Sequence, residues 1–187
     1  MTWAPDYAEI DDLAAYVRIA DDDDDVQLGL AIATSSRAID RHCRRQFGLV
    51  AAPEVRYYEP RWDRRLCRWV VDVDDLMTTV GLLVNGDVVV DPVLLPRNAS
   101  TESRPWTSLA VDVSEEAAVT ARWGWMAIPD PVKQACLLQS SRIFARRGSP
   151  YGIAGSPEAG NELRLLAKVD PDVAVALAPY RKVAMPR

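Results

Sequence analysis

Apolar residues recur every three to four positions in three stretches of the chain, which is the period of an amphipathic α-helix. The first stretch is short and covers residues 11–20. The second runs from about residue 23 to residue 46, with aspartates at its start, arginines near its end and Gly48 as its stop. The third covers residues 131–147, opens with Asp130 as its N-cap and has the widest apolar face. We therefore predict two N-terminal helices and one later core helix.

Between residues 53 and 124 the pattern changes to short segments rich in β-branched and aromatic residues, separated by Pro, Asn and Gly. Two of these segments, "VGLLV" and "DVVVD", flank Asn85-Gly86, which favours a tight hairpin turn because both residues tolerate positive φ. We expect a β insertion between the helices.

After Gly148 the sequence "SPYGIAGSPEAG" has the composition of a linker. We expect two short helices beyond it, each opened by a capping residue and a proline, at Ser156-Pro157 and Asp170-Pro171. Such helices are too short to persist alone in water, so they need a surface to dock on. That surface belongs to another chain, or else the arm folds back on its own helices. The residues that we assign to an assembly interface are Tyr151, Leu163, Leu165, Leu166, Val173, Leu177, Tyr180 and Arg181.

The predicted fold class is α+β, mainly α: a small helical bundle with an inserted β-hairpin or small β-sheet subdomain and an extended C-terminal arm. Residues 1–48 supply the N-terminal helices, 49–125 the β insertion, 126–148 the core helix and 149–187 the arm.

The composition is that of a soluble globular protein, with 49% apolar and 26% charged residues. No apolar run approaches the roughly 18 residues of a membrane span, and the acidic N-terminus is unlike a secretory signal. We expect a cytoplasmic protein with no membrane contact. The three scattered cysteines, Cys43, Cys67 and Cys136, predict no disulfide framework, and we expect them to be buried apolar residues.

The net charge of −5 is unevenly distributed. Residues 1–25 hold nine acidic groups and one basic group, whereas residues 125–187 hold five acidic and nine basic groups. An acidic protein is a poor candidate for wrapping DNA. Ends of opposite sign favour head-to-tail contact between copies, although each exposed pair contributes little.

No set of residues predicts catalysis, a metal or a cofactor. His42 is the only histidine, and its neighbour Cys43 projects about 100° away on a helix, so the two cannot form an activated pair. The aspartate run 21–25 lacks the glycine and glutamate of an EF-hand loop, and the acidic cluster 72–75 has no supporting pattern. Phosphate-binding glycine motifs are absent. We expect a protein that is not an enzyme.

The segment "RWDRRLCRW", residues 61–69, is the best candidate for binding nucleic acid. Its arginines could pair with phosphates while its tryptophans stack on bases. Arginines alternating with apolar residues in an ordinary strand give the same pattern, so both interpretations stand.

The stretch "RWGWMAIPDPVKQACLLQSSRIFARRGSPYGIAGSPE" resembles the head-to-tail connector, or adaptor, proteins of long-tailed bacteriophages. The shared features are the aromatic-glycine-aromatic step at residues 123–125, Pro129, the helix from Val132 to Arg147, and the Ser-Pro pair that follows. The long N-terminal helix ending near Phe47-Gly48 is also similar to the family, whereas the β insertion matches only in type.

The resemblance implies a structural virion protein that forms a closed ring of about twelve copies below the portal. Its partners would be other copies of itself, the portal and a stopper or other neck protein, with genomic DNA passing through without specific binding. It would reside in the virion neck, and in the host cytoplasm during assembly. One alternative is another neck component, such as a stopper or tail-completion protein. A second is a DNA-binding packaging or regulatory module, although the aspartate run between the first two helices would repel phosphate.

Overall fold

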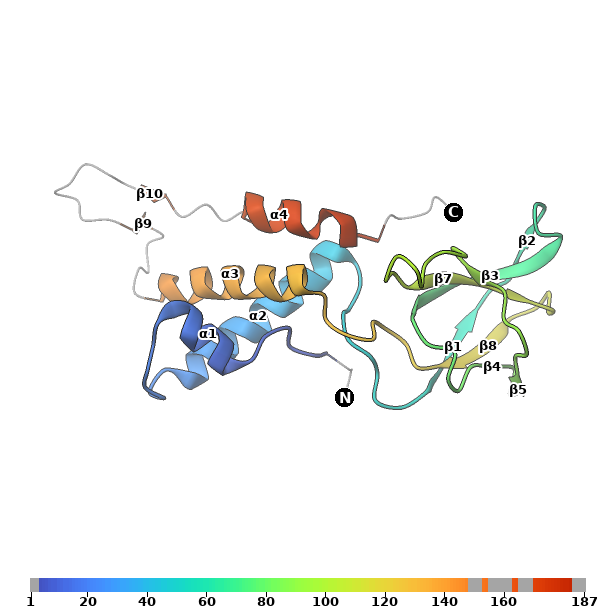
Figure 1. Cartoon of the computed structure of the whole chain (residues 1–187), viewed down its shortest axis with the longest axis horizontal. Helices are drawn as coiled ribbons and strands as arrows, with labels where there is room; N and C mark the ends of the chain where they lie inside the picture. The colour runs from blue at the N-terminus through green and yellow to red at the C-terminus, as the bar shows by residue number, and fades with distance from the viewer. Residues whose placement is uncertain (1–3, 148–152, 155–162, 165–169, 183–187) are drawn as a thin grey trace. The chain divides into compact units, whose positions relative to one another are not determined.

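The computed structural model describes residues 4–147, 153–154, 163–164 and 170–182. The chain forms two compact units (Figure 1). The β unit consists of residues 46–127, and the helical unit consists of the segments on either side, Thr2–Arg45 and Ile128–Arg187. The β unit is therefore an insertion, with ends at 46 and 127 where the sequence predicts 49 and 125.

The helical unit is built on one apolar core. Its helices are α1 (Ile10–Val17), α2 (Asp25–Cys43), α3 (Asp130–Arg146) and α4 (Pro171–Leu177), with a short 3-10 turn, η2 (Ala178–Tyr180), after the last. Helices α2 and α3 lie side by side, α1 packs against both, and α4 packs against α3. The buried side chains that they share include Leu13, Leu28, Ile32, Ile39, Val132, Cys136, Val173 and Leu177.

The ends of the helices α1, α2 and α3 differ by one to three residues from those that the sequence predicts. Helix α2 stops at Cys43 because Arg44 adopts a left-handed conformation, with φ 54°, and donates its N–H to the Asp40 carbonyl. Gly48, the predicted stop, lies in the β unit instead. Helix α3 has Pro129 as its N-cap, so Asp130 is its first helical residue rather than its cap.

The β unit contains two antiparallel sheets of four strands each. The first sheet has the order β1-β8-β4-β5, formed by Glu54–Tyr58, Ala117–Ala121, Leu83–Val84 and Asp87–Val88. The second has the order β2-β3-β7-β6, formed by Arg61–Asp63, Arg68–Leu76, Trp106–Val111 and Leu94–Leu95. The fold is mixed α+β, with 34% of the described residues in helices and 24% in strands, so the β part is larger than the small insertion that the sequence suggests.

The hairpin turn predicted at Asn85-Gly86 is confirmed. Asn85 has φ 52° and Gly86 has φ 90°, while Val84 pairs with Asp87 across the turn. Asn85 also fastens the turn to β8, because its side-chain oxygen accepts the Ala118 N–H at 2.8 Å and its own N–H donates to the Ala118 carbonyl at 2.8 Å.

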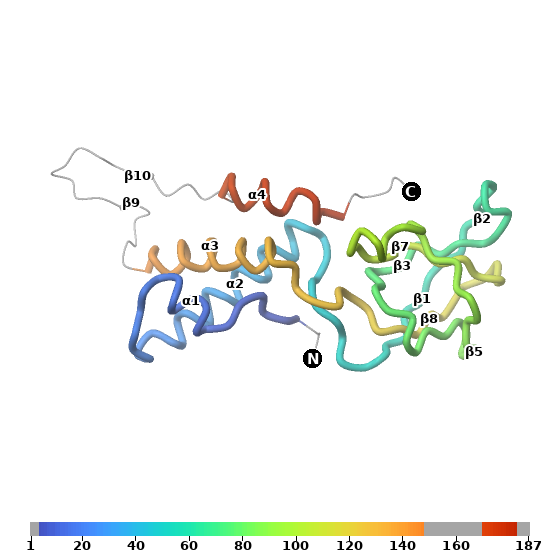
Figure 2. The backbone as a smooth tube through the Cα atoms, in the orientation of Figure 1, coloured from blue at the N-terminus to red at the C-terminus, as the bar shows by residue number. Residues whose placement is uncertain are grey.

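The chain enters the β unit once and leaves it once (Figure 2), and the aromatic-glycine-aromatic step at residues 123–125 joins the leaving segment to the entering one. Gly124 forms an antiparallel bridge with Leu49, and the Trp125 N–H donates to the Gly48 carbonyl at 2.9 Å. The two indoles extend this closure: Trp123 Nε1 donates to the backbone carbonyl of residue 54 at 2.8 Å, and Trp125 Nε1 donates to the Asp75 carboxylate at 2.9 Å.

Part of the predicted arm forms a different structure. Ile153–Ala154 (β9) pairs antiparallel with Leu163–Arg164 (β10), so Leu163 lies in a strand and not in the predicted helix. Ser156, where that helix was predicted to open, lies outside the described residues. The sequence between these strands contains two glycines and a proline, which favour a reversal of the chain over a continuous helix.

Candidate interaction surfaces

Helix α4 docks on its own helical unit. Asp170 caps it as predicted, because its side chain accepts the Asp172 N–H at 2.8 Å. The Asp170 carboxylate also pairs with Arg142 of α3. Val173 is buried and Leu177 is fully buried, with no exposed surface. The prediction that these two side chains await a neighbouring subunit or the portal is therefore wrong. They complete the apolar core of their own chain, which is the alternative that the sequence left open.

The other predicted interface residues are placed as follows. Tyr180 is half-buried and Arg181 is exposed just after α4, where the Lys182 N–H donates to the Cys43 carbonyl at 2.8 Å. Leu163 lies in β10, and the remaining three, Tyr151, Leu165 and Leu166, lie outside the described residues. The structure thus brings Val173, Leu177, Tyr180 and Arg181 together only as part of the helical unit.

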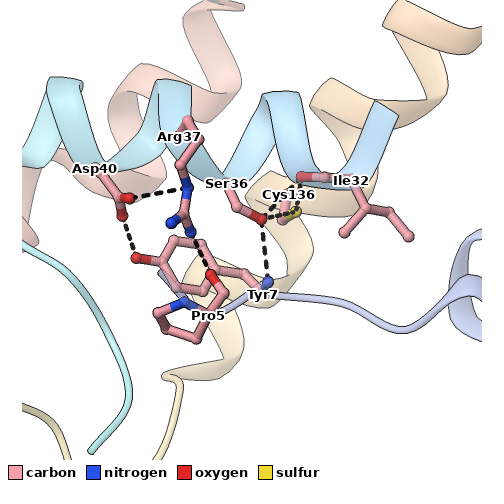
Figure 3. A network of polar contacts seen from close by, with 7 residues as sticks. All are labelled: Pro5, Tyr7, Ile32, Ser36, Arg37, Asp40 and Cys136. Atoms are coloured by element: carbon pink, nitrogen blue, oxygen red, sulfur yellow. Dashed lines mark hydrogen bonds and ion pairs between the residues drawn. The ribbon is translucent and has the colours of Figure 1, made fainter. Parts of the chain in front are cut away.

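A polar network fixes the N-terminal segment to α2 (Figure 3). Ser36 Oγ accepts the Tyr7 N–H at 3.1 Å and donates to the Ile32 carbonyl at 2.8 Å, while the Tyr7 hydroxyl donates to Asp40. Arg37 pairs with Asp40 at 3.2 Å and also donates to the carbonyl of residue 5. These polar side chains hold the backbone in place. Sequence reasoning missed the network because Tyr7 and α2 are about thirty residues apart in the chain.

The thiols differ in exposure. Cys43 and Cys136 are buried as predicted, whereas Cys67 is exposed, which contradicts the prediction for that residue. Burial raises the pKa of Cys43 to about 11 and raises the pKa of Cys136 above its ordinary value. Both stay protonated at neutral pH, and a thiol is a much weaker nucleophile than a thiolate.

The remaining candidates for chemistry are unexceptional. Partial burial and then the charge of Arg181 lower the pKa of His42, so the imidazole is neutral at pH 7. Among the described residues no three His, Cys, Asp or Glu side chains gather in a way that could hold a metal ion. Within the same residues no helix combines the length and apolar character of a bilayer span.

The aspartate run forms the turn before α2, and we call Asp21, Asp22 and Asp23 the acidic turn. All three are exposed and have no ion pair among the described residues. Asp24 differs, because Arg147 from the end of α3 donates to it at 2.7 Å and lowers its pKa. The run thus links α2 to α3 through one residue and leaves three carboxylates in water.

One face of the first sheet is apolar and open to solvent. Val55 of β1 lies opposite Thr120 of β8, Thr120 lies opposite Leu83 of β4, and Leu83 lies opposite Val88 of β5. Residues that oppose one another in antiparallel strands project to the same side of the sheet. These side chains therefore form a row across all four strands, and Tyr57 with its partner Ala118 begins a second row.

We call these six residues, Val55, Tyr57, Leu83, Val88, Ala118 and Thr120, the outer sheet face. None of them is charged, and Val55, Tyr57 and Val88 are 50%, 66% and 74% exposed. The alternate residues of β8 point to the other side and are buried. A contiguous exposed apolar patch is a feature of surfaces that contact other proteins. The alternation in "EVRYY" hints at this face, but only the strand register shows that four strands contribute to it.

The "RWDRRLCRW" segment forms the β2–β3 hairpin, which confirms its strand interpretation. Trp62 and Trp69 oppose one another and contact edge to face, with ring centroids 5.4 Å apart. Arg61 donates two hydrogen bonds of 3.1 Å to Asp72. The other three arginines are exposed at and beside the connection between the strands and have no ion pair among the described residues; we call Arg64, Arg65 and Arg68 the arginine tip.

No protein-family model matches the chain, and no curated protein matches its sequence. The resemblance to phage adaptors therefore depends on the residues that carry it, namely the 122–158 stretch and the long N-terminal helix.

Proposed function

We propose that the chain is a structural virion protein, an adaptor that forms a ring below the portal, joins the DNA-filled head to the tail and continues the DNA channel. The observation that carries this proposal is the outer sheet face. A ring subunit needs surfaces that it buries only when its neighbours arrive, and this face is apolar, uncharged and open to solvent in the single chain. Burying apolar surface stabilises an association by roughly 25 cal/mol per Å².

The amino acids on this face suit a protein contact. The cores of protein interfaces are depleted in charged residues and enriched in aromatic residues such as Tyr. Here Tyr57 lies beside Val55 with no charge among its row partners, although the chain as a whole is 26% charged. Several polar side chains hold the fold together, as in the Arg61–Asp72 pair and the network around Tyr7 and Ser36. These features support a role in assembly over a role in chemistry.

The proposed partners are other copies of this chain, the portal, and a stopper or other neck protein. A ring requires a heterologous contact, in which each copy offers two different surfaces and the rotation closes. The copy number would match that of the portal. DNA would pass through the centre without specific binding, which suits a net charge of −5.

The test is to place the chain in the virion. A size-tagged chain, incorporated in phage particles and imaged by electron cryomicroscopy, should add density to a ring directly against the portal. Density further toward the tail would identify a stopper or tail-completion protein instead. Particles that contain none of the chain would refute a structural role in the virion.

The DNA-binding module remains the second candidate, and the arginine tip is the observation that favours it. The adaptor proposal predicts no appreciable binding of duplex DNA at physiological salt. Sub-micromolar affinity in a fluorescence anisotropy titration at that salt would favour the DNA-binding module.

A further inference from the structure

The arginine tip is held in a fixed conformation by its own turn. Asp63 Oδ1 accepts the N–H of Arg65 at 2.8 Å and the N–H of Leu66 at 3.1 Å, and Cys67 completes the turn with φ 51°. The flanking strands stay in register up to the turn, where Asp63 pairs with Arg68. A fixed turn loses little conformational entropy when a partner binds, so it is suited to recognition.

The tip is positively charged within an acidic unit. Residues 46–127 contain twelve acidic and eight basic residues. Three of the other five arginines in the unit pair with nearby carboxylates: Arg61 with Asp72, Arg56 with Asp74 at 2.7 Å, and Arg104 with Glu102. The carboxylate at the tip is that of Asp63, which accepts two backbone N–H groups of the turn, and the three guanidinium groups outnumber it and leave the tip positively charged. The guanidinium groups of the arginine tip have no ion pair among the described residues and are open to a partner outside the unit.

The same chain carries a surface of the complementary kind. The three carboxylates of the acidic turn equal the three guanidinium groups of the tip in number and are opposite to them in charge. Arg18, at the end of α1, is a single exposed cation on the same connection and leaves the turn negative. Val26 and Leu30, one turn apart on α2, are exposed next to it in sequence and offer an apolar contact for the half-exposed Trp62.

We propose that the arginine tip of one copy docks on the acidic turn of a second copy. Arginine pairs with carboxylates through two parallel hydrogen bonds. Because a single exposed ion pair contributes little, the contact depends on three pairs and on burial of the Trp62 indole, and tryptophan and arginine are the residues that dominate many interfaces. The two surfaces differ, so the contact is heterologous and can repeat around a ring. The inference gives the self-contact of the proposed adaptor and rests on that function.

Disulfide trapping tests the contact in the full chain, because Cys67 places an exposed thiol in the tip. The probe is an Asp22→Cys/Cys67→Ser chain with a tag that separates its bands on a gel. Oxidised glutathione is added to an equal mixture of this probe and the wild-type chain. We expect a mixed dimer between position 22 of the probe and Cys67 of the wild type, at several times the yield from a matched control probe, Thr34→Cys/Cys67→Ser, whose thiol lies on an exposed part of α2.

Charge reversal supplies the specificity of the test. Arg64→Glu/Arg65→Glu in the Cys67 chain should reduce the mixed dimer to the control level. Adding Asp21→Arg/Asp23→Arg to the probe should restore it. All four positions are exposed, so circular dichroism should show unchanged folding.

Two results would overturn the inference: a mixed-dimer yield equal to that of the Thr34→Cys control, or a yield that does not respond to charge reversal. If the tip reversal instead abolished retention of a single-stranded oligonucleotide and left the cross-link unchanged, the tip would bind nucleic acid. If the cross-link fails but the tagged chain is found against the portal in the virion, the adaptor role stands and the self-contact is refuted. If the cross-link forms but the virion contains none of the chain, the self-contact stands and the adaptor role is refuted.

Discussion

Gly124 lies so close to Gly48 that a Cβ added to Gly124 would be 2.0 Å from the Gly48 carbonyl oxygen. That oxygen is part of the backbone and also accepts the Trp125 N–H, so it cannot move aside without breaking the closure of the β unit. Gly124 also has φ 109°, a conformation that residues with a side chain rarely adopt.

Gly124→Ala should therefore destabilise the β unit by at least about 2 kcal/mol, through a backbone clash and backbone strain together. Gly86→Ala is the matched control. Gly86 has φ 90°, but a Cβ added to it would have no neighbouring atom within 4 Å, so the substitution adds only backbone strain, at about 1 kcal/mol. Urea unfolding followed by tryptophan fluorescence measures both, because five of the six tryptophans lie in residues 46–127. Equal losses would contradict the close approach.

Leu177→Ala should destabilise the helical unit by about 2–4 kcal/mol, because it leaves a cavity in the core that α4 completes. Val175 lies on the same helix but is 75% exposed, so Val175→Ala should change stability by less than about 0.5 kcal/mol. Unfolding followed by circular dichroism at 222 nm reports on this unit, since α1 to α4 all belong to it. A chain truncated after Gly148 should likewise lose stability. A truncated chain as stable as the wild type would show that α4 is not core.

One thiol of three should react with a disulfide reagent in the folded chain at pH 8. Cys67 is exposed, whereas Cys43 and Cys136 are buried with raised pKa values and little thiolate. The pKa of Cys43 is about 11 in the folded chain and 9.0 in the unfolded chain. Its burial as a neutral thiol therefore stabilises the fold below pH 9.0, and this contribution is lost as the pH rises toward about 11. Cys67→Ser should abolish the fast reaction, and denaturation should expose all remaining thiols. Two or more fast thiols in the native chain would contradict the burial.

Tyr57→Glu should leave the isolated chain folded, because the side chain is 66% exposed, but should weaken assembly by placing a charge on the outer sheet face. Val119→Glu, on the buried side of β8, should unfold the β unit instead. Complementation of particles that lack the protein measures assembly, and circular dichroism checks folding. Full assembly by the folded Tyr57→Glu chain would remove the outer sheet face from the adaptor proposal.

Local signals in the sequence were sufficient for the four helices α1 to α4 and for the Asn85-Gly86 hairpin, but not for the β9–β10 pair, where a helix was predicted. Asn85-Gly86 specifies its turn through backbone preference alone, and Asp170-Pro171 specifies a helix start through a side-chain cap and a missing N–H. Both signals act within four residues, so tertiary structure is not needed to interpret them.

The surfaces could not be predicted in the same way. The apolar side of α4 shows that it must be buried, but no local pattern says whether its own chain or another supplies the partner. The outer sheet face depends on a register that joins Val55 and Val88, which are far apart in the sequence and meet only through β8 and β4. The arginine tip was found as a motif, yet its free charges became apparent only when Arg61 was seen to be paired.

The bridge between Leu49 and Gly124 brings the two ends of the β unit together, so the unit could be replaced by another inserted structure. Two residues bridged across antiparallel backbones have Cα atoms about 5 Å apart. The helical unit is therefore joined to two neighbouring chain positions, whatever structure lies between them. A shorter loop, a single hairpin or a larger barrel could be grafted at the same place without altering how α2 and α3 pack. Related chains can therefore keep the helical unit while the inserted part diverges in size and sequence.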